Sequence, residues 1–155
     1  MLDVACSSNG TRNFKPLGKL KPDGQVALMT DELSRPNGIA FSPDFSKCYV
    51  ANSDPNRAIW MVYEMTDEKT FTNGKVFFNA TEMVSKNKGL PDGLKVRKDG
   101  TIFATGPGGV LIFSPEGKHL GTISPGEATA NCGFNENQTM LFMTADMYMT
   151  MIRLK

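Results

Sequence analysis

Short apolar runs separated by tight-turn sequences recur along most of this chain. The turn signals combine Gly, Pro, Asp or Asn, and they lie at 22–24, 42–44, 73–74, 98–100, 114–117 and 125–127. The runs between them, such as AIWMVYEM at 58–65, are rich in β-branched and aromatic residues. Such spacing is typical of antiparallel strands joined by hairpins. Only 81–89 has the composition of a helical turn, so the sequence predicts an all-β fold.

Three stretches of the sequence share one pattern: a polar residue leads a short strand, and a polar turn and a second strand with an aromatic residue follow. These stretches are 34–52, 89–106 and 128–145, and their polar leaders are Asn37, Asp92 and Asn131. A repeat of about 40–50 residues built from four strands has the size of one blade of a β-propeller. We therefore predict about three four-stranded blades, with a sandwich of about seven strands as the alternative.

The polar leaders occupy the same position in each repeat. In a propeller, equivalent positions of successive blades converge on one end of the central channel. Amide and carboxylate oxygens are the ligands that hard divalent cations prefer, and Asn37 and Asp92 supply one of each. Each is preceded by Pro and followed by Gly, so a plain tight turn remains the alternative for either motif taken alone.

Longer stretches of the chain resemble one family. SRPNGIAFSPD at 34–44, GLPDGLKV at 89–96 and GPGGVLIFSPEGKHLGTI at 106–123 are similar to the gluconolactonase, senescence marker protein (regucalcin) and luciferin-regenerating-enzyme-like family. The resemblance implies a six-bladed β-propeller of about twice this length, of which the chain would be the C-terminal half. On this interpretation residues 1–15 are a divergent N-terminal segment and residues 16–155 are the partial propeller.

The resemblance also implies a chemistry, the opening of a sugar lactone with the help of one divalent cation (Ca²⁺, Zn²⁺, Mn²⁺ or Mg²⁺). It places the family's metal-binding asparagine on Asn37. Its metal-binding aspartate, which is also the expected general base, falls on Asp92. Asn131 matches a polar position that lines the substrate pocket, and Ser53 and Asp54 lie where the pocket wall is expected. The glutamate that is the family's first metal ligand has no counterpart in this chain.

The sequence leaves open whether this chain is itself an enzyme. One hypothesis is a divalent-metal-dependent lactone hydrolase in a truncated or partial form. The alternative is a non-catalytic half-propeller that acts as a binding or calcium-binding module. A fragment of a longer enzyme, a half-propeller that pairs with itself and an inactive relic all fit the pattern. Open blade edges favour self-association, because unpaired strand edges pair readily with another chain.

Composition excludes several other classes of protein. The charge is nearly balanced, with 17 Lys and Arg against 16 Asp and Glu, so no basic surface for nucleic acid or membranes is expected. No apolar run approaches the roughly 18 residues of a membrane span. Three cysteines stand far apart and His119 is the single histidine, so a Cys/His zinc site is excluded. Free thiols fit a reducing compartment, and a cytoplasmic location is the expectation.

Overall fold

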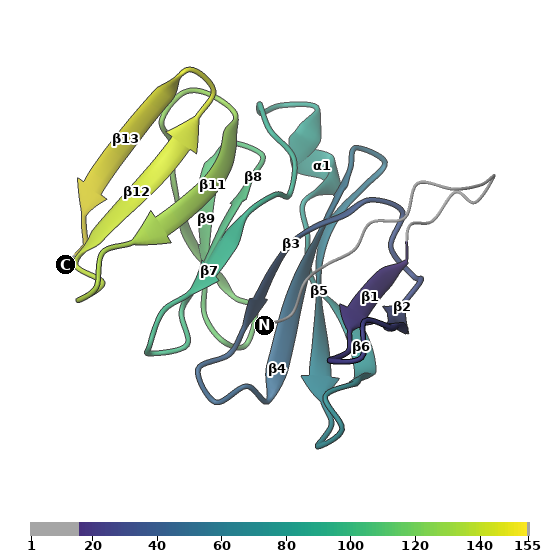
Figure 1. Ribbon diagram of the computed structural model, residues 1–155. Coiled ribbons are helices and arrows are strands. Elements are labelled where there is room, and N and C mark those ends of the chain that lie inside the picture. The colour runs from purple at the N-terminus through teal and green to yellow at the C-terminus, as the bar shows by residue number, and fades with distance from the viewer. Residues whose placement is uncertain (1–15, 155) are drawn as a thin grey trace.

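The computed structural model describes residues 16–154, so the predicted divergent segment at 1–15 lies outside the described residues. Strands dominate this part of the chain, and α1 (Thr81–Val84) is its single α-helix (Figure 1). The strands form four antiparallel sheets of two, four, four and three strands. The prediction of an all-β fold is confirmed.

Each sheet is built from strands that follow one another in the sequence. The two-stranded sheet pairs β1 (Leu17–Leu20) with β2 (Val26–Thr30). The first four-stranded sheet contains β3 (Pro36–Phe41), β4 (Lys47–Asp54), β5 (Arg57–Met65) and β6 (Phe71–Asn79). The second contains β7 (Leu94–Val96), β8 (Ile102–Gly106), β9 (Gly109–Phe113) and β10 (His119–Ile123). The last contains β11 (Thr129–Phe134), β12 (Met140–Ala145) and β13 (Tyr148–Arg153).

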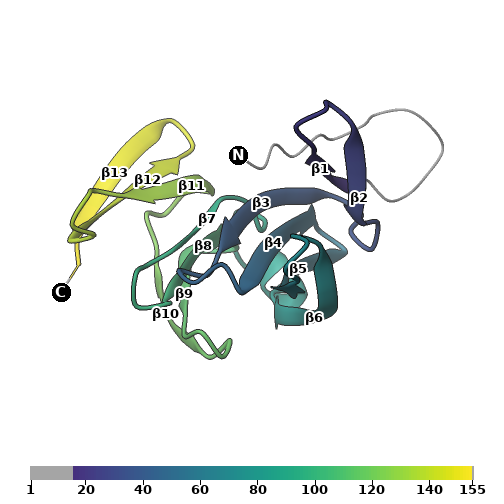
Figure 2. The same cartoon turned by 60° about the horizontal axis from the view of Figure 1, so that its bottom comes forward.

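The sheets follow one another as an open arc, an arrangement of the propeller type. The strands that begin the three repeats, β3, β7 and β11, lie next to each other on the inner side (Figure 1). The two-stranded sheet lies at one end of the arc and the three-stranded sheet at the other (Figure 2). Two sheets thus have the four strands predicted for a blade. The third repeat forms three strands, and an additional two-stranded sheet precedes the first.

Burial on both faces explains why the central strands are almost continuously apolar. In β5 successive side chains point to opposite faces of the sheet. Ile59 and Met61 pack into the core shared with β1–β2, whereas Trp60 and Val62 pack into the core shared with β7–β10. A third core joins β7–β10 to β11–β13. The sheets are therefore held together by apolar packing between neighbours.

The predicted helical turn at 81–89 is shorter in the structure. It forms only as α1, and the chain continues through turns toward Pro91. The helix packs Met83 against the core between the two four-stranded sheets. The loop after it leads from the outer strand β6 back toward the inner strand β7 and carries Asp92 just before that strand.

Candidate functional site

Asn37 and Asp92 hold equivalent places in neighbouring sheets. Asn37 is the second residue of β3, and Asp92 lies two residues before β7 begins. A side chain on Gly38 would collide with the backbone oxygen of Asp92, so the two segments approach closely only because residue 38 is glycine. The structure therefore brings these two predicted residues together on the inner side of the arc.

Backbone hydrogen bonds fix the segment that carries Asp92. The N–H of Asp92 donates to the carbonyl of Thr105 at 3.0 Å, and the N–H of Thr105 donates to the carbonyl of Gly93 at 2.8 Å. The buried hydroxyl of Thr105 donates to the same Gly93 carbonyl at 2.9 Å. The N–H of Gly93 reaches the carbonyl of Ala130 on β11 at 2.9 Å. Asp92 is thus held between β8 and β11 by bonds that do not use its side chain.

Burial raises the pKa of the Asp92 carboxyl above its ordinary value. The nearby Asn37 side chain and Gly93 backbone oppose this effect and lower the pKa. Within residues 16–154, no Lys, Arg or His side chain contributes to the pKa of Asp92. A half-buried carboxylate that lacks a positive partner in the described chain is a chemically suitable place for a cation.

Asn131 lies beside this pair in the third repeat. Its side chain packs against Gly93, where a Cβ would collide with it. Its Oδ1 accepts a hydrogen bond from the N–H of Cys132 at 2.9 Å and one from Lys95 Nζ at 3.5 Å. The structure therefore places the third leader next to the Asp92 segment, with its oxygen already engaged by neighbouring groups.

Ser53 and Asp54 lie at the end of β4, where the chain turns into β5. The Asp54 carboxylate accepts hydrogen bonds from the Ser34 hydroxyl at 2.5 Å and from the Asn56 N–H at 2.9 Å. These two bonds, in that order, lower the pKa of Asp54. The N–H of Ser53 donates to the carbonyl of Arg35 at 2.8 Å. In the structure both residues hold the segment that leads into Asn37, and their role in a pocket wall stays a prediction.

A cavity of about 270 Å³ opens beside Asp92, between the segment before β7 and the strands β11 and β12. Its polar lining includes Thr129, Thr144 and Asp146, and Ser53 and Asp54 are not part of it. Asp146 is a candidate that the sequence analysis missed. It lies in the hairpin turn directly after β12, whereas Asp54 is the last residue of β4, so the turn that follows the second strand of each repeat was the available signal.

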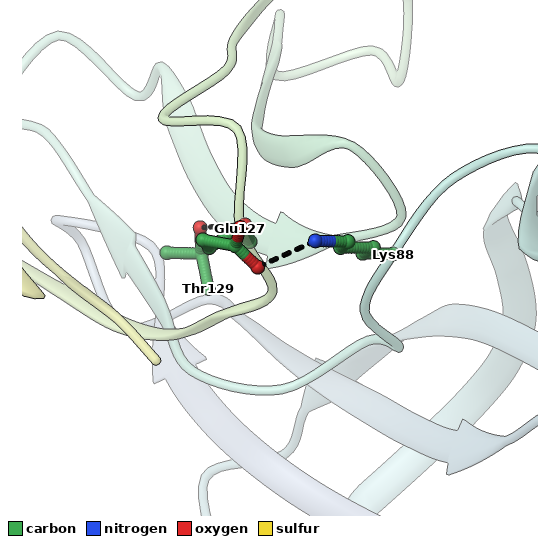
Figure 3. Close-up of polar contacts among 3 residues, drawn as sticks. All are labelled: Lys88, Glu127 and Thr129. Atoms are coloured by element: carbon green, nitrogen blue, oxygen red, sulfur yellow. Dashed lines mark hydrogen bonds and ion pairs between the residues drawn. The ribbon is translucent and has the colours of Figure 1, made fainter. Parts of the chain in front are cut away.

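An ion pair joins the sequence neighbours of two cavity-lining residues, Gly89 and Ala128. Lys88 Nζ lies 2.7 Å from Glu127 Oε2, and the Thr129 hydroxyl donates to the Glu127 carbonyl at 3.3 Å (Figure 3). The hydrogen bond that Lys88 Nζ donates to Glu127 raises the pKa of Lys88, and the negative charges of Glu127 and Asp146 add to this. The pair joins the loop before β7 to the segment before β11, and it places a positive charge near Asp146.

The donor set suits a cation only in part. Asn37 and Asp92 supply an amide and a carboxylate oxygen, whereas Ca²⁺ takes about 6–8 oxygen ligands. Among residues 16–154, no group of three or more His, Cys, Asp or Glu side chains is placed to hold a metal ion. Asn37 and Asp92 alone therefore supply fewer oxygen donors than such a cation takes, and residues 16–154 hold no complete metal site.

Neighbouring antiparallel sheets with polar residues gathered at their inner strands define a protein of the propeller type. The chain belongs to the SMP-30/gluconolactonase/LRE-like family, whose model matches residues 4–146. It is 41% identical over 150 residues to a gluconolactonase of Zymomonas mobilis, which covers 92% of this chain and 41% of that protein. The resemblance found in the sequence is confirmed.

Solved structures give the same result. A gluconolactonase of Xanthomonas campestris matches with a TM-score of 0.80 and 28% identity, over 97% of this chain and 48% of that one. A calcium-binding regucalcin of Agrobacterium tumefaciens matches with a TM-score of 0.65 and 23% identity, over 85% and 49% of the two chains. The chain thus spans about two fifths of the length of the Zymomonas relative and about half of these structures. No helix in the described part of the chain has the length and apolar character needed to cross a membrane.

Proposed function

We propose that this chain carries part of the site of a divalent-cation-dependent lactone hydrolase, in which Asn37 and Asp92 are cation ligands and Asp92 is the general base. The observation that carries the proposal is the half-buried Asp92 carboxylate, which lies near the Asn37 side chain and has no cationic partner in residues 16–154. The gluconolactonases among its relatives support a lactone as the substrate.

Asp92 is suited to take a proton from an attacking water. Burial raises its pKa, which makes the ionised carboxylate a stronger base than that of an exposed aspartate. The backbone bonds of Asp92 and Gly93 fix the segment that carries the carboxylate, so little ordering of this backbone is needed when a substrate arrives. A bound divalent cation would polarise the lactone carbonyl and stabilise the oxyanion that forms.

Asn37 contributes an oxygen without adding charge. Its side-chain amide carries both an NH₂ donor and a carbonyl acceptor, so the same group can contact Asp92 and present an oxygen to a cation. The cavity beside Asp92 is lined by two hydroxyls and the second carboxylate, Asp146. Such a lining suits a substrate with several hydroxyl groups, and it supports a sugar lactone over an apolar ester.

The remaining ligands are proposed to lie outside this chain, in the part of its relatives that it does not span. A non-catalytic calcium-binding module is the second candidate, and the two-donor site favours it for the chain alone. We also propose a cytoplasmic location. Both described cysteines, Cys48 and Cys132, are free and buried, which supports a reducing compartment.

Two measurements on the full chain test the proposal. The first is Mn²⁺ binding followed by electron paramagnetic resonance. The second is gluconolactone hydrolysis with Ca²⁺, Mn²⁺, Zn²⁺ or Mg²⁺ and with a chelator. Asp92→Asn should abolish both signals, and Asp99→Asn, in the exposed turn after β7, should leave both intact. Binding without hydrolysis favours the calcium-binding module. Equal Mn²⁺ binding by both variants contradicts the assignment of Asp92.

A further inference from the structure

A cavity of about 430 Å³ opens between the two four-stranded sheets. Strands β4, β5 and β6 supply most of its lining, and the turn between β9 and β10 supplies Pro115 and Glu116. Its volume lies within the range of small-molecule sites, about 300–1,000 Å³. Lys47 of the lining is the first residue of β4, whereas Asp54, close to the Asn37 segment, is the last. The cavity therefore lies at the opposite end of this sheet from Asn37.

Apolar packing between the two sheets fixes one part of this cavity. Val62 and Phe77 belong to its lining, and Val62 is only 6% exposed. The Phe77 ring lies 5.1 Å from the ring of Tyr49 and 5.6 Å from that of Phe113, centroid to centroid. A Cβ on Gly117, in the turn between β9 and β10, would lie 3.1 Å from the backbone oxygen of Phe77. The cavity is therefore formed before any ligand arrives, between two sheets that pack directly on each other.

Two lysines and two glutamates also line the cavity, namely Lys47, Lys75, Glu64 and Glu116. Lys47 and Glu64 lie opposite each other on β4 and β5, but within residues 16–154 no ion pair joins them. Glu64 Oε2 instead accepts a hydrogen bond from Asn73 Nδ2 at 2.6 Å. The nearby Ser114 side chain, and more weakly the charge of Lys47, lower the pKa of Glu116. Both carboxylates thus have uncharged neighbours that stabilise them, and neither forms an ion pair with a lysine of the lining.

The ammonium groups of Lys47 and Lys75 have no partner in the part of the chain that the structure describes. Neither Nζ atom lies within 4.0 Å of a carboxylate there. Each ammonium has three N–H donors and no acceptor, whereas carboxylates and phosphates supply the matching acceptor oxygens. A cationic ligand would instead need Glu64, whose carboxylate is already bonded to Asn73. The lining therefore offers unused positive donors to an anion.

We propose that this cavity binds a small organic anion, a carboxylate or a phosphate ester, whose charged group contacts Lys47 and Lys75. The carbon skeleton of the ligand packs on Val62 and Phe77, which favours an organic anion over an inorganic one. Hydrogen bonds between two charged groups are about twice as strong as neutral ones, so the two lysines supply most of the affinity. The site lies apart from the proposed cation ligands and does not depend on lactone hydrolysis.

Two-dimensional ¹H–¹⁵N NMR of the full chain, in a phosphate-free buffer, tests the proposal without any measurement of hydrolysis. The probes are phenyl phosphate and benzoate, which carry the two kinds of charged group on the same ring, and benzyl alcohol is their neutral counterpart. Either anion should shift the amide signals of Val62, Lys75 and Phe77 along saturable curves, while those of Gly93 and Thr105 stay in place. Benzyl alcohol should bind at least about tenfold more weakly. The anion that binds more tightly identifies the preferred charged group.

Lysine variants test which side chains hold the anion. Lys47→Gln and Lys75→Gln should each weaken binding of the preferred anion by about tenfold, because each removes one charged donor. Lys118→Gln is the matched control, because Lys118 is exposed just after the turn between β9 and β10 and does not line the cavity. It removes the same charge and should change the affinity by less than about twofold at physiological salt, which screens distant surface charges. The amide spectra also show that each variant stays folded.

Three results would overturn the proposal. The first is the absence of a saturable shift with either anion, and the second is binding of benzyl alcohol as tightly as the anions. The third is an equal loss of affinity in all three lysine variants, which would show attraction to the general surface charge. Shifts centred on Gly93 would place the anion beside Asp92 and would also contradict this site. None of these results bears on Mn²⁺ binding by Asp92, so the two proposals fail separately.

Discussion

The buried side chain of Asn52 holds the backbone that leads into Asn37. Its Oδ1 accepts a hydrogen bond from the N–H of Arg35 at 2.7 Å. Its Nδ2 donates to the carbonyl of Arg57 at 2.8 Å and to the Ser34 hydroxyl at 3.2 Å. A side chain at the end of β4 thus fixes both the hairpin turn into β5 and the entry into β3.

Asn52→Leu should lower the free energy of unfolding by about 1–3 kcal/mol, because the N–H of Arg35 and the carbonyl of Arg57 lose a buried partner. The cation affinity of Asn37 and Asp92 should fall with it, since the Asn37 segment is no longer held. Urea unfolding and Mn²⁺ titration measure the two effects. Asn56→Leu is the matched control on the exposed turn of the same hairpin, and it should change stability by less than about 0.5 kcal/mol. Equal losses in both variants would contradict this role of Asn52.

Close approach of the inner strands gives a second prediction. Gly38→Ala should destabilise the fold by about 1–3 kcal/mol, because the new methyl group meets the Asp92 carbonyl and the Leu94 side chain. It should also displace Asp92 and weaken cation binding. Gly121→Ala is the control, because no atom lies within 4 Å of a Cβ at that position. Thermal unfolding of the two variants compares them, and similar melting temperatures would argue against the close contact.

The inner strands and their polar leaders could be predicted because the signals are local. Each of Asn37 and Asp92 lies between a proline and a glycine, and the repeat gives their common phase. Asn37 and Asp92 come close together because the inner strands of neighbouring sheets converge. The shared position of the two residues in the repeat is therefore enough to predict that they lie side by side. Asn131 is placed by the same rule.

Other parts of the site depend on contacts that the sequence does not encode locally. Asn52 reads as an ordinary residue after a strand, and only the tertiary fold shows that it is buried between two turns. Asp146 shares a cavity with Asp92 across the gap between two sheets. The sequence assigns β1 and β2 to no repeat. The described residues contain no further strands that would complete their sheet as a four-stranded blade.

Asp146 should act on substrate recognition. Its carboxylate can accept hydrogen bonds from hydroxyl groups of a lactone held beside Asp92. If the chain hydrolyses lactones, Asp146→Asn should raise the KM for gluconolactone by about 5–20-fold with little change in kcat, as expected for loss of a charge-assisted hydrogen bond. The unsubstituted δ-valerolactone, which has no hydroxyl groups, serves as the control substrate and should show no change. A lower kcat for both substrates would instead assign Asp146 to the chemical step.

The raised pKa of Asp92 predicts how pH acts on cation binding and on stability. Cations bind the ionised carboxylate, so Mn²⁺ affinity should fall on acidification at a higher pH than for an exposed aspartate. Without a cation, the contribution of Asp92 to the free energy of unfolding should instead increase on acidification. Folding favours the protonated form, so the contribution of Asp92 is most favourable below its ordinary pKa and is lost as the pH rises through the raised value. Asp92→Asn removes the charge, and should therefore make the cation-free chain slightly more stable near neutral pH. Urea unfolding with a chelator between pH 4 and 7 measures this, and a less stable Asp92→Asn variant at pH 7 would show that the carboxylate is compensated within the chain.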